Sequence, residues 1–484
     1  MERREARNVA QAQLFPEDCE DGPYKGYKRL HWIHSAAESR KDERCNVLMH
    51  HLNEHNLRRA FHELDGSKAS GIDHVSKQEY EKELTSHLAK LADEIRRGGW
   101  RPKPSREVLI PKPQGGTRPL AIGCLEDKIV QVLVARILEA LYEPHFHRHS
   151  FGFRRGKSAH QALARTYKVI VERRAKCVVV EMDIEKFFNS MSHDWLLEKL
   201  AQKIGDSHFL RLIRRMLRNS ILSENGELVT SELGTPQGSP ASPILANIYL
   251  HYLLDEWFRE NWTGRGEMVR YADDAVYVFT DEQTAKAFQA ALVTRMQEAG
   301  LHLNLDKSKV IPFDDQDPKG TVSLLGFEFY WGRNLKRQRV LKLKTAPKRL
   351  ARCMQAFKEW IKRFRNRLPL AKLWDKASAK LQGHYNYFGL CFNSAKVSHF
   401  YITCTKLLFK WLNRRSQKRS FTWEKFERRL WFNPLPKPPR GEHLLDISAS
   451  EFGSGWKPKP KSRMRKLRTS GSQRSIGRQR PVFT

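Results

Sequence analysis

The 484-residue sequence is long enough for several domains and is strongly basic: Lys and Arg number 87, Asp and Glu 54, and the formal net charge is +33. This excess favours a polyanionic partner, most simply a nucleic acid. The hydrophobic content of 40% excludes a wholly disordered chain, and no apolar run approaches the length of a membrane span. The first seven residues alternate acid and base without an apolar segment behind them, so we expect a cytoplasmic protein.

The seven cysteines are scattered and form no Cys-x-x-Cys pair, which disfavours both a zinc module and a disulfide framework. One cluster, Cys45, His50, His51 and His55, raises the alternative of a metal held by the His51/His55 pair on a helix. Because no second pair of ligands lies nearby in the sequence, we prefer a polar helix face there.

The N-terminal half begins with a polar, charged segment, residues 1–55, with a helix expected over its His-rich part. Helical stretches from Asn56 to about Glu94 flank a Gly/Ser-rich loop at 65–73. Residues 106–123 predict a β-hairpin, because β-branched runs flank a Pro/Gly-rich turn. Helical periodicity follows from Leu125 to Leu141.

Three segments further along predict strands. The β-branched run Cys177–Ile184 is one strand, Met268–Phe279 is two strands around a tight turn, and Leu324–Tyr330 is another short strand. Amphipathic helices are expected at about 193–220, 240–260 and 283–299. Residues 60–335 are therefore α+β, with few strands and many helices.

From Lys342 to Trp431 the pattern becomes helical and very basic, with aromatic residues interleaved among Lys and Arg. Core packing would account for the aromatics equally well, but a basic helical module of this kind is typical of an RNA or DNA surface. Pro434–Arg440 is interpreted as a linker. Lys457–Arg480 carries ten basic residues and no acid, and we expect a disordered tail that adds phosphate affinity.

Three carboxylates stand out among apolar neighbours. Asp183 ends a hydrophobic strand, and Asp273 and Asp274 lie at the turn of the predicted hairpin. Acids in such surroundings are costly unless paired or bound to metal. If the two strands are neighbours, the carboxylates converge, and a site of oxygen ligands without His or Cys suits Mg²⁺. The plainer alternative is that Asp is simply a common turn residue.

The ordered motifs around these acids resemble those of reverse transcriptases encoded by group II introns. Tyr271–Asp274 (Tyr-Ala-Asp-Asp) matches the family's catalytic tetrapeptide, and Glu181–Phe188 resembles its first carboxylate motif. Gly234–Asn247 is similar to the loop and helix under the templating base. Four further segments match motifs of the fingers and palm: 110–120, 150–160, 305–309 and 324–327. Segment 381–388 is similar to the centre of the maturase thumb.

The resemblance implies an α+β right-hand polymerase fold followed by an all-helical domain. Residues 56–335 would form the fingers and palm, and residues 336–433 the thumb or maturase domain. Residues 1–55 would be a basic, helical extension, and residues 434–484 a Pro-linked basic tail.

The same resemblance implies a metal site of two Mg²⁺ ions, with Mn²⁺ as a substitute in vitro. Asp183 and Asp273 would hold the ions, Asp274 would support them, and Ile184 would complete the site. Two such ions about 4 Å apart could activate a 3′-hydroxyl and stabilise the leaving pyrophosphate.

Residues around the metal site are implied to bind the deoxynucleoside triphosphate. Lys112 and Arg118 would neutralise the triphosphate. Phe188 would stack under the sugar and exclude a 2′-hydroxyl, although an aromatic residue of the core would have the same sequence pattern. Lys307 is a candidate proton donor to pyrophosphate. Three loop residues would let the main chain approach the nucleotide: Pro236, Gln237 and Gly238.

The implied function is an RNA-directed DNA polymerase that also binds structured group II intron RNA and assists splicing and retrohoming. Its partners would be an RNA template with a DNA primer, nucleotides and a DNA target, with no membrane. Asn189 stands where many relatives carry Asp, so the resemblance implies no third acid there. No endonuclease motif follows the helical region, which argues against DNA cleavage.

Two alternatives remain. A stand-alone retron-like or antiviral-defence reverse transcriptase is disfavoured, because no Val-Thr-Gly motif occurs and the helical region is long. A splicing cofactor with a vestigial polymerase is disfavoured because Asp183, Asp273 and Asp274 are all present.

Overall fold

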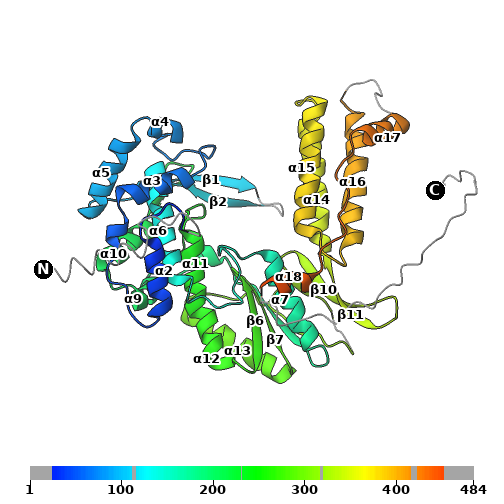
Figure 1. The fold of residues 1–484 in the computed structure, drawn as a ribbon, viewed down its shortest axis with the longest axis horizontal. Helices are drawn as coiled ribbons and strands as arrows, with labels where there is room; N and C mark the ends of the chain where they lie inside the picture. Colours follow the sequence, from blue (N-terminus) through cyan, green and yellow to red (C-terminus); the bar gives the residue numbers. More distant parts are fainter. Residues whose placement is uncertain (1–23, 112–115, 231, 317–319, 416–421, 452–484) are drawn as a thin grey trace, which may run out of the picture.

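The computed structural model describes residues 24–111, 116–230, 232–316, 320–415 and 422–451 (Figure 1). Helices surround three small sheets, so the expected α+β class is confirmed. Helices α14 (Pro347–Phe364), α15 (Leu370–Phe388) and α16 (Ser394–Leu412) stand apart from the hairpin of β1 (Ser105–Pro111) and β2 (Thr117–Ile122) (Figure 1). The central strands β6 (Gly266–Tyr271) and β7 (Asp274–Phe279) lie below both (Figure 1). Within the described ranges, no helix has the length and apolar character that a bilayer crossing requires.

The central sheet is antiparallel and buried on both faces. Its strands run in the order β6 (Gly266–Tyr271), β7 (Asp274–Phe279), β3 (Val178–Met182) and β8 (Val310–Pro312). Val180, paired with Tyr277, belongs to one hydrophobic core, whereas Val179, paired with Val278, belongs to the other. Side chains alternate between faces along a strand, so a strand buried on both faces reads as a continuous apolar run. This accounts for the β-branched run that predicts β3.

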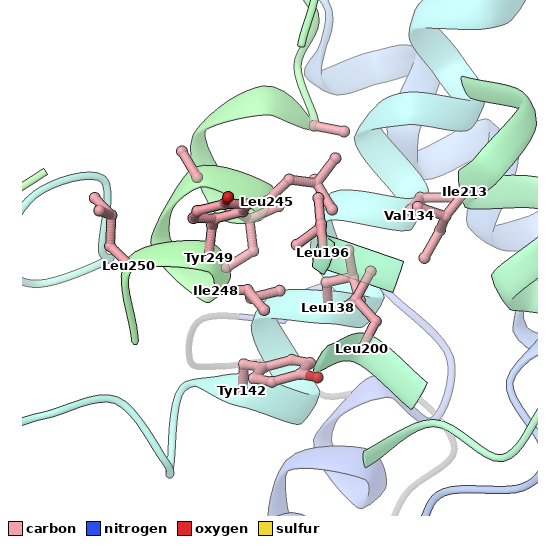
Figure 2. Close-up of a cluster of buried hydrophobic side chains, with 14 of the residues drawn as sticks. Val134, Leu138, Tyr142, Leu196, Leu200, Ile213, Leu245, Ile248, Tyr249 and Leu250 are labelled. Atoms are coloured by element: carbon pink, nitrogen blue, oxygen red, sulfur yellow. The ribbon is translucent and has the colours of Figure 1, made fainter. Parts of the chain in front are cut away.

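Helices cover one face of this sheet and form the first core with it. They are α6 (Leu125–Tyr142), α9 (His193–Lys203), α10 (Ser207–Leu217), α11 (Ser242–Leu250), α12 (Glu256–Trp262) and α13 (Glu282–Glu298). A π-helical turn, His251–Asp255, joins α11 to α12. Figure 2 shows Leu138, Leu196 and Ile248 from three of these helices meeting in this core.

The single helix expected at about 193–220 is wrong: the segment forms two helices, α9 and α10. Asp206 separates them, because its carboxylate accepts hydrogen bonds from the N–H groups of His208 and Phe209, both at 3.1 Å. Such side-chain capping starts a new helix. The chain then leaves α10 and enters β4 at Ser220.

The predicted β-hairpin is confirmed as β1 (Ser105–Pro111) and β2 (Thr117–Ile122). A four-stranded sheet continues from β1 through β4 (Ser220–Leu222) and β5 (Leu228–Thr230). The N-terminal helices are α2 (Leu30–Ser39), α3 (Glu54–Glu63), α4 (Lys77–Glu81) and α5 (Leu84–Arg96). Of these, α2 and α3 pack on α6, and α5 packs on α3 and α4.

The His-rich segment does not form one helix. A single 3₁₀ turn, Met49–His51, ends before α3, whose first residue is Glu54 and whose N-cap is Asn53. His51 is buried and does not share a helix with His55. Among the described residues no group of three His, Cys, Asp or Glu is arranged for a metal ion, so the alternative metal site has no support.

The second core lies on the opposite face of the central sheet, where α7 (Ala159–Glu172) and a third sheet pack. That sheet consists of β9 (Val322–Leu324), β10 (Phe327–Arg333) and β11 (Arg339–Thr345). The single strand expected at Leu324–Tyr330 is therefore wrong. A tight turn divides it, with φ of 53° at Leu325 and 80° at Gly326, a conformation typical of short hairpin loops.

The helical region begins at Pro347 rather than at Lys342, because Lys342 lies in β11 and pairs with Tyr330. Its helices are α14 (Pro347–Phe364), α15 (Leu370–Phe388), α16 (Ser394–Leu412) and α17 (Trp423–Phe432). The interleaved aromatics serve its core, since Phe357, Trp374, Tyr385, Phe388 and Trp411 are all buried.

The segment interpreted as a linker is packed against α15. Leu435 is buried, the indole N–H of Trp374 donates to the Asn433 carbonyl at 3.1 Å, and the Tyr385 hydroxyl donates to the Pro436 carbonyl at 3.0 Å. Helix α18 (Leu444–Glu451) follows and lies beside α7 (Figure 1). The predicted linker thus connects α17 to α18 without a helix or strand of its own, but it packs on α15 rather than extending away from the fold. The basic run Lys457–Arg480 lies outside the described residues.

Candidate active site

The three carboxylates lie at one end of two paired strands. Asp183 directly follows β3, and Asp274 is the first residue of β7. Met182 pairs with Ala275, so Asp183 and Asp274 are the next residues along neighbouring strands. Asp273 lies in the two-residue turn between Tyr271 and Asp274. The expectation that the two acidic segments are brought together by adjacent strands is confirmed.

The carboxylates repel one another. The pKa of Asp274 is raised to about 6, first because the surrounding protein displaces water and then because Asp273 and Asp183 are negative. Lys307 opposes the rise, and its ammonium donates to Asp183 Oδ2 at 2.8 Å. Asp274 nevertheless keeps a solvent-exposed surface. Excess negative charge at an accessible position is the chemistry that attracts a cation.

The loop that carries Lys307 is bonded to the chain around Asp183. The N–H of Asn304 donates to the Asp183 carbonyl at 2.9 Å, and the Asp183 N–H donates to the Ser308 hydroxyl at 3.2 Å. Ile184 forms an isolated bridge to Leu303 in the same loop. Its buried, apolar side chain leaves only its main-chain oxygen as a candidate ligand.

The turn between β6 and β7 is held from outside the hairpin. Ala272 has a φ of 55°, an uncommon conformation for a residue with a Cβ. Gly152 lies against it so closely that a Cβ there would stand 2.2 Å from the Ala272 nitrogen. Asn247 donates to the Gly152 carbonyl at 2.7 Å. The segment before α7 therefore fits against the acidic turn only because residue 152 is glycine.

Arg270 supports the same turn from within the core. Its guanidinium is fully buried and makes two hydrogen bonds to Asp255, at 2.7 and 2.5 Å. A third nitrogen contact reaches the Ala272 carbonyl at 3.1 Å. Sequence reasoning missed this pair. A signal was present, because a charged residue within the apolar strand β6 requires a partner when buried.

The loop Gly234–Gly238 packs between the segment after Asp183 and strand β2. Thr235 N–H donates to the Phe188 carbonyl at 2.7 Å, and the Gln237 carbonyl accepts from the Ala121 N–H at 2.8 Å. The Gln237 amide donates to Asn189 Oδ1 at 3.0 Å. A cavity of about 120 Å³ lies beside this loop, lined in part by Asn189, Pro236 and Gln237.

Gly238 and Pro236 fix the course of this loop. Gly238 has a φ of 114°, and a Cβ there would stand 2.8 Å from the Ala121 carbonyl oxygen, so both conformation and space favour glycine. The Pro236 carbonyl accepts a hydrogen bond from the Ser242 hydroxyl at 3.0 Å, which ties the loop to the start of α11.

Phe188 is half-buried and packs edge-to-face on Phe153, with ring centroids 6.3 Å apart. Phe153 is 46% exposed. The pair thus presents an aromatic surface five residues beyond Asp183, at the start of the short helix α8 (Phe187–Ser190).

Two candidate phosphate ligands are described less fully. Lys112 lies outside the described residues. The main chain of Arg118 pairs with Ile110 in the β1–β2 hairpin, and nothing is described of its side chain.

The segment 381–388 packs against the β9–β10 turn and against α7 through Tyr387 of α15. Its hydroxyl donates to the Leu325 carbonyl at 2.9 Å, and its own carbonyl contacts the His160 ring at 2.8 Å. Burial raises the pKa of Tyr387, and the charge of Asp274 adds to that rise. The helical region therefore contacts the β9–β10 turn and α7, and Tyr387 lies near enough to Asp274 for that charge to act on it.

Comparison with known proteins gives a consistent family. Residues 110–329 match the family model described as reverse transcriptase (RNA-dependent DNA polymerase), and this range contains every candidate site residue. Protein YkfC of Escherichia coli is 32% identical over 285 residues, which cover 52% of this chain and 74% of YkfC.

Relatives named for introns are also similar. Group II intron-encoded protein LtrA of Lactococcus lactis is 37% identical over 167 residues, covering 34% of this chain and 27% of LtrA. An uncharacterized 91 kDa protein in a cob intron of Schizosaccharomyces pombe is 47% identical over 158 residues, covering 33% of this chain and 19% of that protein. The chain thus spans about a quarter or less of these two relatives.

Proposed function

We propose that this chain, which belongs to the reverse transcriptase family, is an RNA-directed DNA polymerase of the group II intron-encoded kind. The observation that carries the proposal is the convergence of Asp183, Asp273 and Asp274 at one end of the paired strands β3 and β7. Residues 56–335 would act as fingers and palm, and the helices α14–α17 as a thumb.

The donor chemistry of the carboxylates suits a divalent metal, although among the described residues no three His, Cys, Asp or Glu side chains are already arranged around a metal position. All side-chain donors are oxygens, and the raised pKa of Asp274 reflects negative charge that a cation would neutralise. Asp183 and Asp273 would hold two Mg²⁺ ions, with Asp274 and the main-chain oxygen of Ile184 beside them. When bound, such ions activate the 3′-hydroxyl of the primer and neutralise the leaving pyrophosphate.

The chain's own groups would bind and orient the nucleotide. Lys112 and Arg118, on the β1–β2 hairpin, would neutralise the triphosphate. Phe188 would stack under the sugar and exclude a 2′-hydroxyl. Lys307, which already holds Asp183, would donate a proton to pyrophosphate as it leaves. The loop Pro236–Gly238 would let the main chain approach the base.

A role in splicing is the second part of the proposal. The relatives named as intron proteins support an intron RNA as partner, and the net charge of +33 provides for phosphate contacts. The basic helical region would hold the structured RNA, and retrohoming into a DNA target would use the same polymerase.

Primer extension tests the polymerase. Asp273→Asn is expected to lower the rate at which a DNA primer is extended on an RNA template by a factor of about 100 or more, because a metal-binding carboxylate is lost. The affinity for RNA should change little. Asp375→Asn, which removes an exposed acid from α15, is the matched control and should extend normally. Normal extension by Asp273→Asn would overturn the metal assignment.

Sequencing the RNA that copurifies with the protein from its own cells tests the splicing role. One long structured RNA flanking the coding region is expected. A short RNA joined to DNA, or unrelated cellular RNA, would leave the polymerase standing and overturn the splicing role.

A further inference from the structure

Helix α10 presents an unusually basic face. Arg211, Arg214, Arg215 and Arg218 follow the i, i+3, i+4, i+7 spacing that aligns side chains along one side of a helix. The opposite side is buried in the first core: Phe209, Leu212, Ile213, Met216 and Leu217. The fold therefore fixes the direction of these four guanidiniums away from the core.

Together with Arg101 they line a hollow of about 410 Å³, which we call the arginine site. Two of the five guanidiniums are held by the main chain. Arg101 donates to the carbonyls of Gly98 and Trp100 at 3.1 and 3.0 Å, and Arg215 donates to the same two at 2.9 and 3.2 Å. These bonds position two like charges side by side, so the site is built and is more than a solvated surface.

The charge of the arginine site is uncompensated. Within the ranges that the structure describes, no carboxylate lies within ion-pair distance of these five arginines. Asp194 and Glu198 line an adjoining hollow with Arg211 and Arg214, but Glu198 pairs with Lys199 at 3.0 Å. Burial and the charges of Arg101 and Arg211 lower the pKa of Arg215. An anionic ligand would relieve this repulsion.

The arginine site adjoins the loop under the nucleotide. Asn219 lines both the arginine site and the cavity beside Pro236 and Gln237. It is buried, and its amide donates to the Ser105 hydroxyl at 3.2 Å. A strand leaving the nucleotide loop at this cavity therefore meets the arginines next.

We propose that the arginine site binds the backbone phosphates of the single-stranded RNA template before it reaches the templating position. A volume of about 410 Å³ suits a ligand the size of a nucleotide and is too small for a duplex. The lining consists of the five guanidiniums with two prolines, Asn219 and Ser220, and this density of positive charge favours contacts to phosphate. This inference rests on the proposed polymerase function.

The test compares the affinity for primer-template duplexes with RNA 5′ overhangs of about 2 and about 12 nucleotides, read by fluorescence anisotropy. The triple variant Arg211→Gln/Arg214→Gln/Arg218→Gln removes the three exposed guanidiniums that make no described hydrogen bond. In the wild type the long overhang should raise the affinity above that for the short overhang. In the triple variant we expect this gain in affinity to be smaller by about tenfold or more. The slope of log affinity against log salt should become shallower by about 2.

The control Arg40→Gln/Arg259→Gln/Lys286→Gln removes the same charge from side chains paired with neighbouring acids, and it should keep the wild-type gain. The charge-keeping variant Arg211→Lys/Arg214→Lys/Arg218→Lys should retain most of the gain in affinity. Retention would show that the loss in the glutamine variant comes from lost charge and not from misfolding. The proposal would be overturned if the control lost as much of the overhang-dependent gain in affinity as the triple variant does. It would also be overturned if the triple variant lost as much affinity for duplex DNA as for the long RNA overhang. Binding is measured without nucleotide, so a chain that failed to polymerise would still report on the site.

Discussion

The guanidinium of Arg270 and the carboxylate of Asp255 form a fully buried pair that connects the π-helical turn after α11 to the acidic hairpin. Because Arg270 also donates to the Ala272 carbonyl, the pair couples the helical core to the turn that carries Asp273. The position of the carboxylates therefore depends on two residues that never face solvent.

Replacing one partner of this pair should be strongly destabilising. Asp255→Asn leaves a buried guanidinium without its counter-charge, at a cost of about 3–5 kcal/mol in the free energy of unfolding. The double variant Arg270→Met/Asp255→Leu removes both charges and should recover most of that stability. Its rate of primer extension should nevertheless remain below that of the wild type, because the Ala272 carbonyl loses its hydrogen-bond donor.

Chemical denaturation and primer extension, measured on both variants, separate these effects. A double variant no more stable than Asp255→Asn would contradict the pairing argument. A double variant with wild-type extension would contradict the positioning role of Arg270.

Gly152→Ala should disturb the acidic turn directly. The added Cβ would lie 2.2 Å from the Ala272 nitrogen, so the main chain must move, at a cost of about 1–3 kcal/mol or more. We expect lower stability and a fall in kcat for extension. Gly383→Ala is the control, since a Cβ there meets nothing within 4 Å in the helix α15, and it should stabilise by up to about 1 kcal/mol. Unchanged kcat in Gly152→Ala would contradict the close fit.

Asp274→Asn should change the pH dependence of stability in metal-free protein. The folded pKa of about 6 lies above the ordinary value of 3.8, so folding disfavours the charged carboxylate. The loss of stability as pH rises from about 4 to about 6 should be smaller in the variant than in the wild type. Asp127 and Glu181, whose pKa values burial raises to about 7, contribute equally to both proteins. The Tm of the variant is therefore expected to exceed that of the wild type at pH 7.5, with no difference below pH 4.

Magnesium should reverse this order. Binding to the native carboxylates raises the Tm of the wild type, more at pH 7.5 than at pH 5.5 where Asp274 is protonated, and it should do less for Asp274→Asn. An equal Mg²⁺ response in both proteins would count against a metal site that includes Asp274.

Much of the fold could be predicted from local pattern. The run after Cys177 and the hairpin around Asp273 have the period and composition of strands, and α13 has the periodicity of a helix, so each is encoded within its own segment. The differences between prediction and structure fall where a distant contact decides the outcome. Lys342 reads as part of a helical region but pairs with Tyr330, and the Pro-rich segment near Leu435 reads as a linker but packs on α15.

The acids, glycines and loop residues of the candidate site can be predicted from the sequence, because chemistry and order along the chain are local properties. Their neighbours follow from tertiary packing alone. It is the register of β3 on β7 that brings Asp183 to Asp274, and the packing of α10 near Trp100 that brings Arg101 to Arg215. The pairing of Arg270 with Asp255 is of the same kind. Contacts between segments far apart in the chain depend on how whole elements pack, and no local pattern records that.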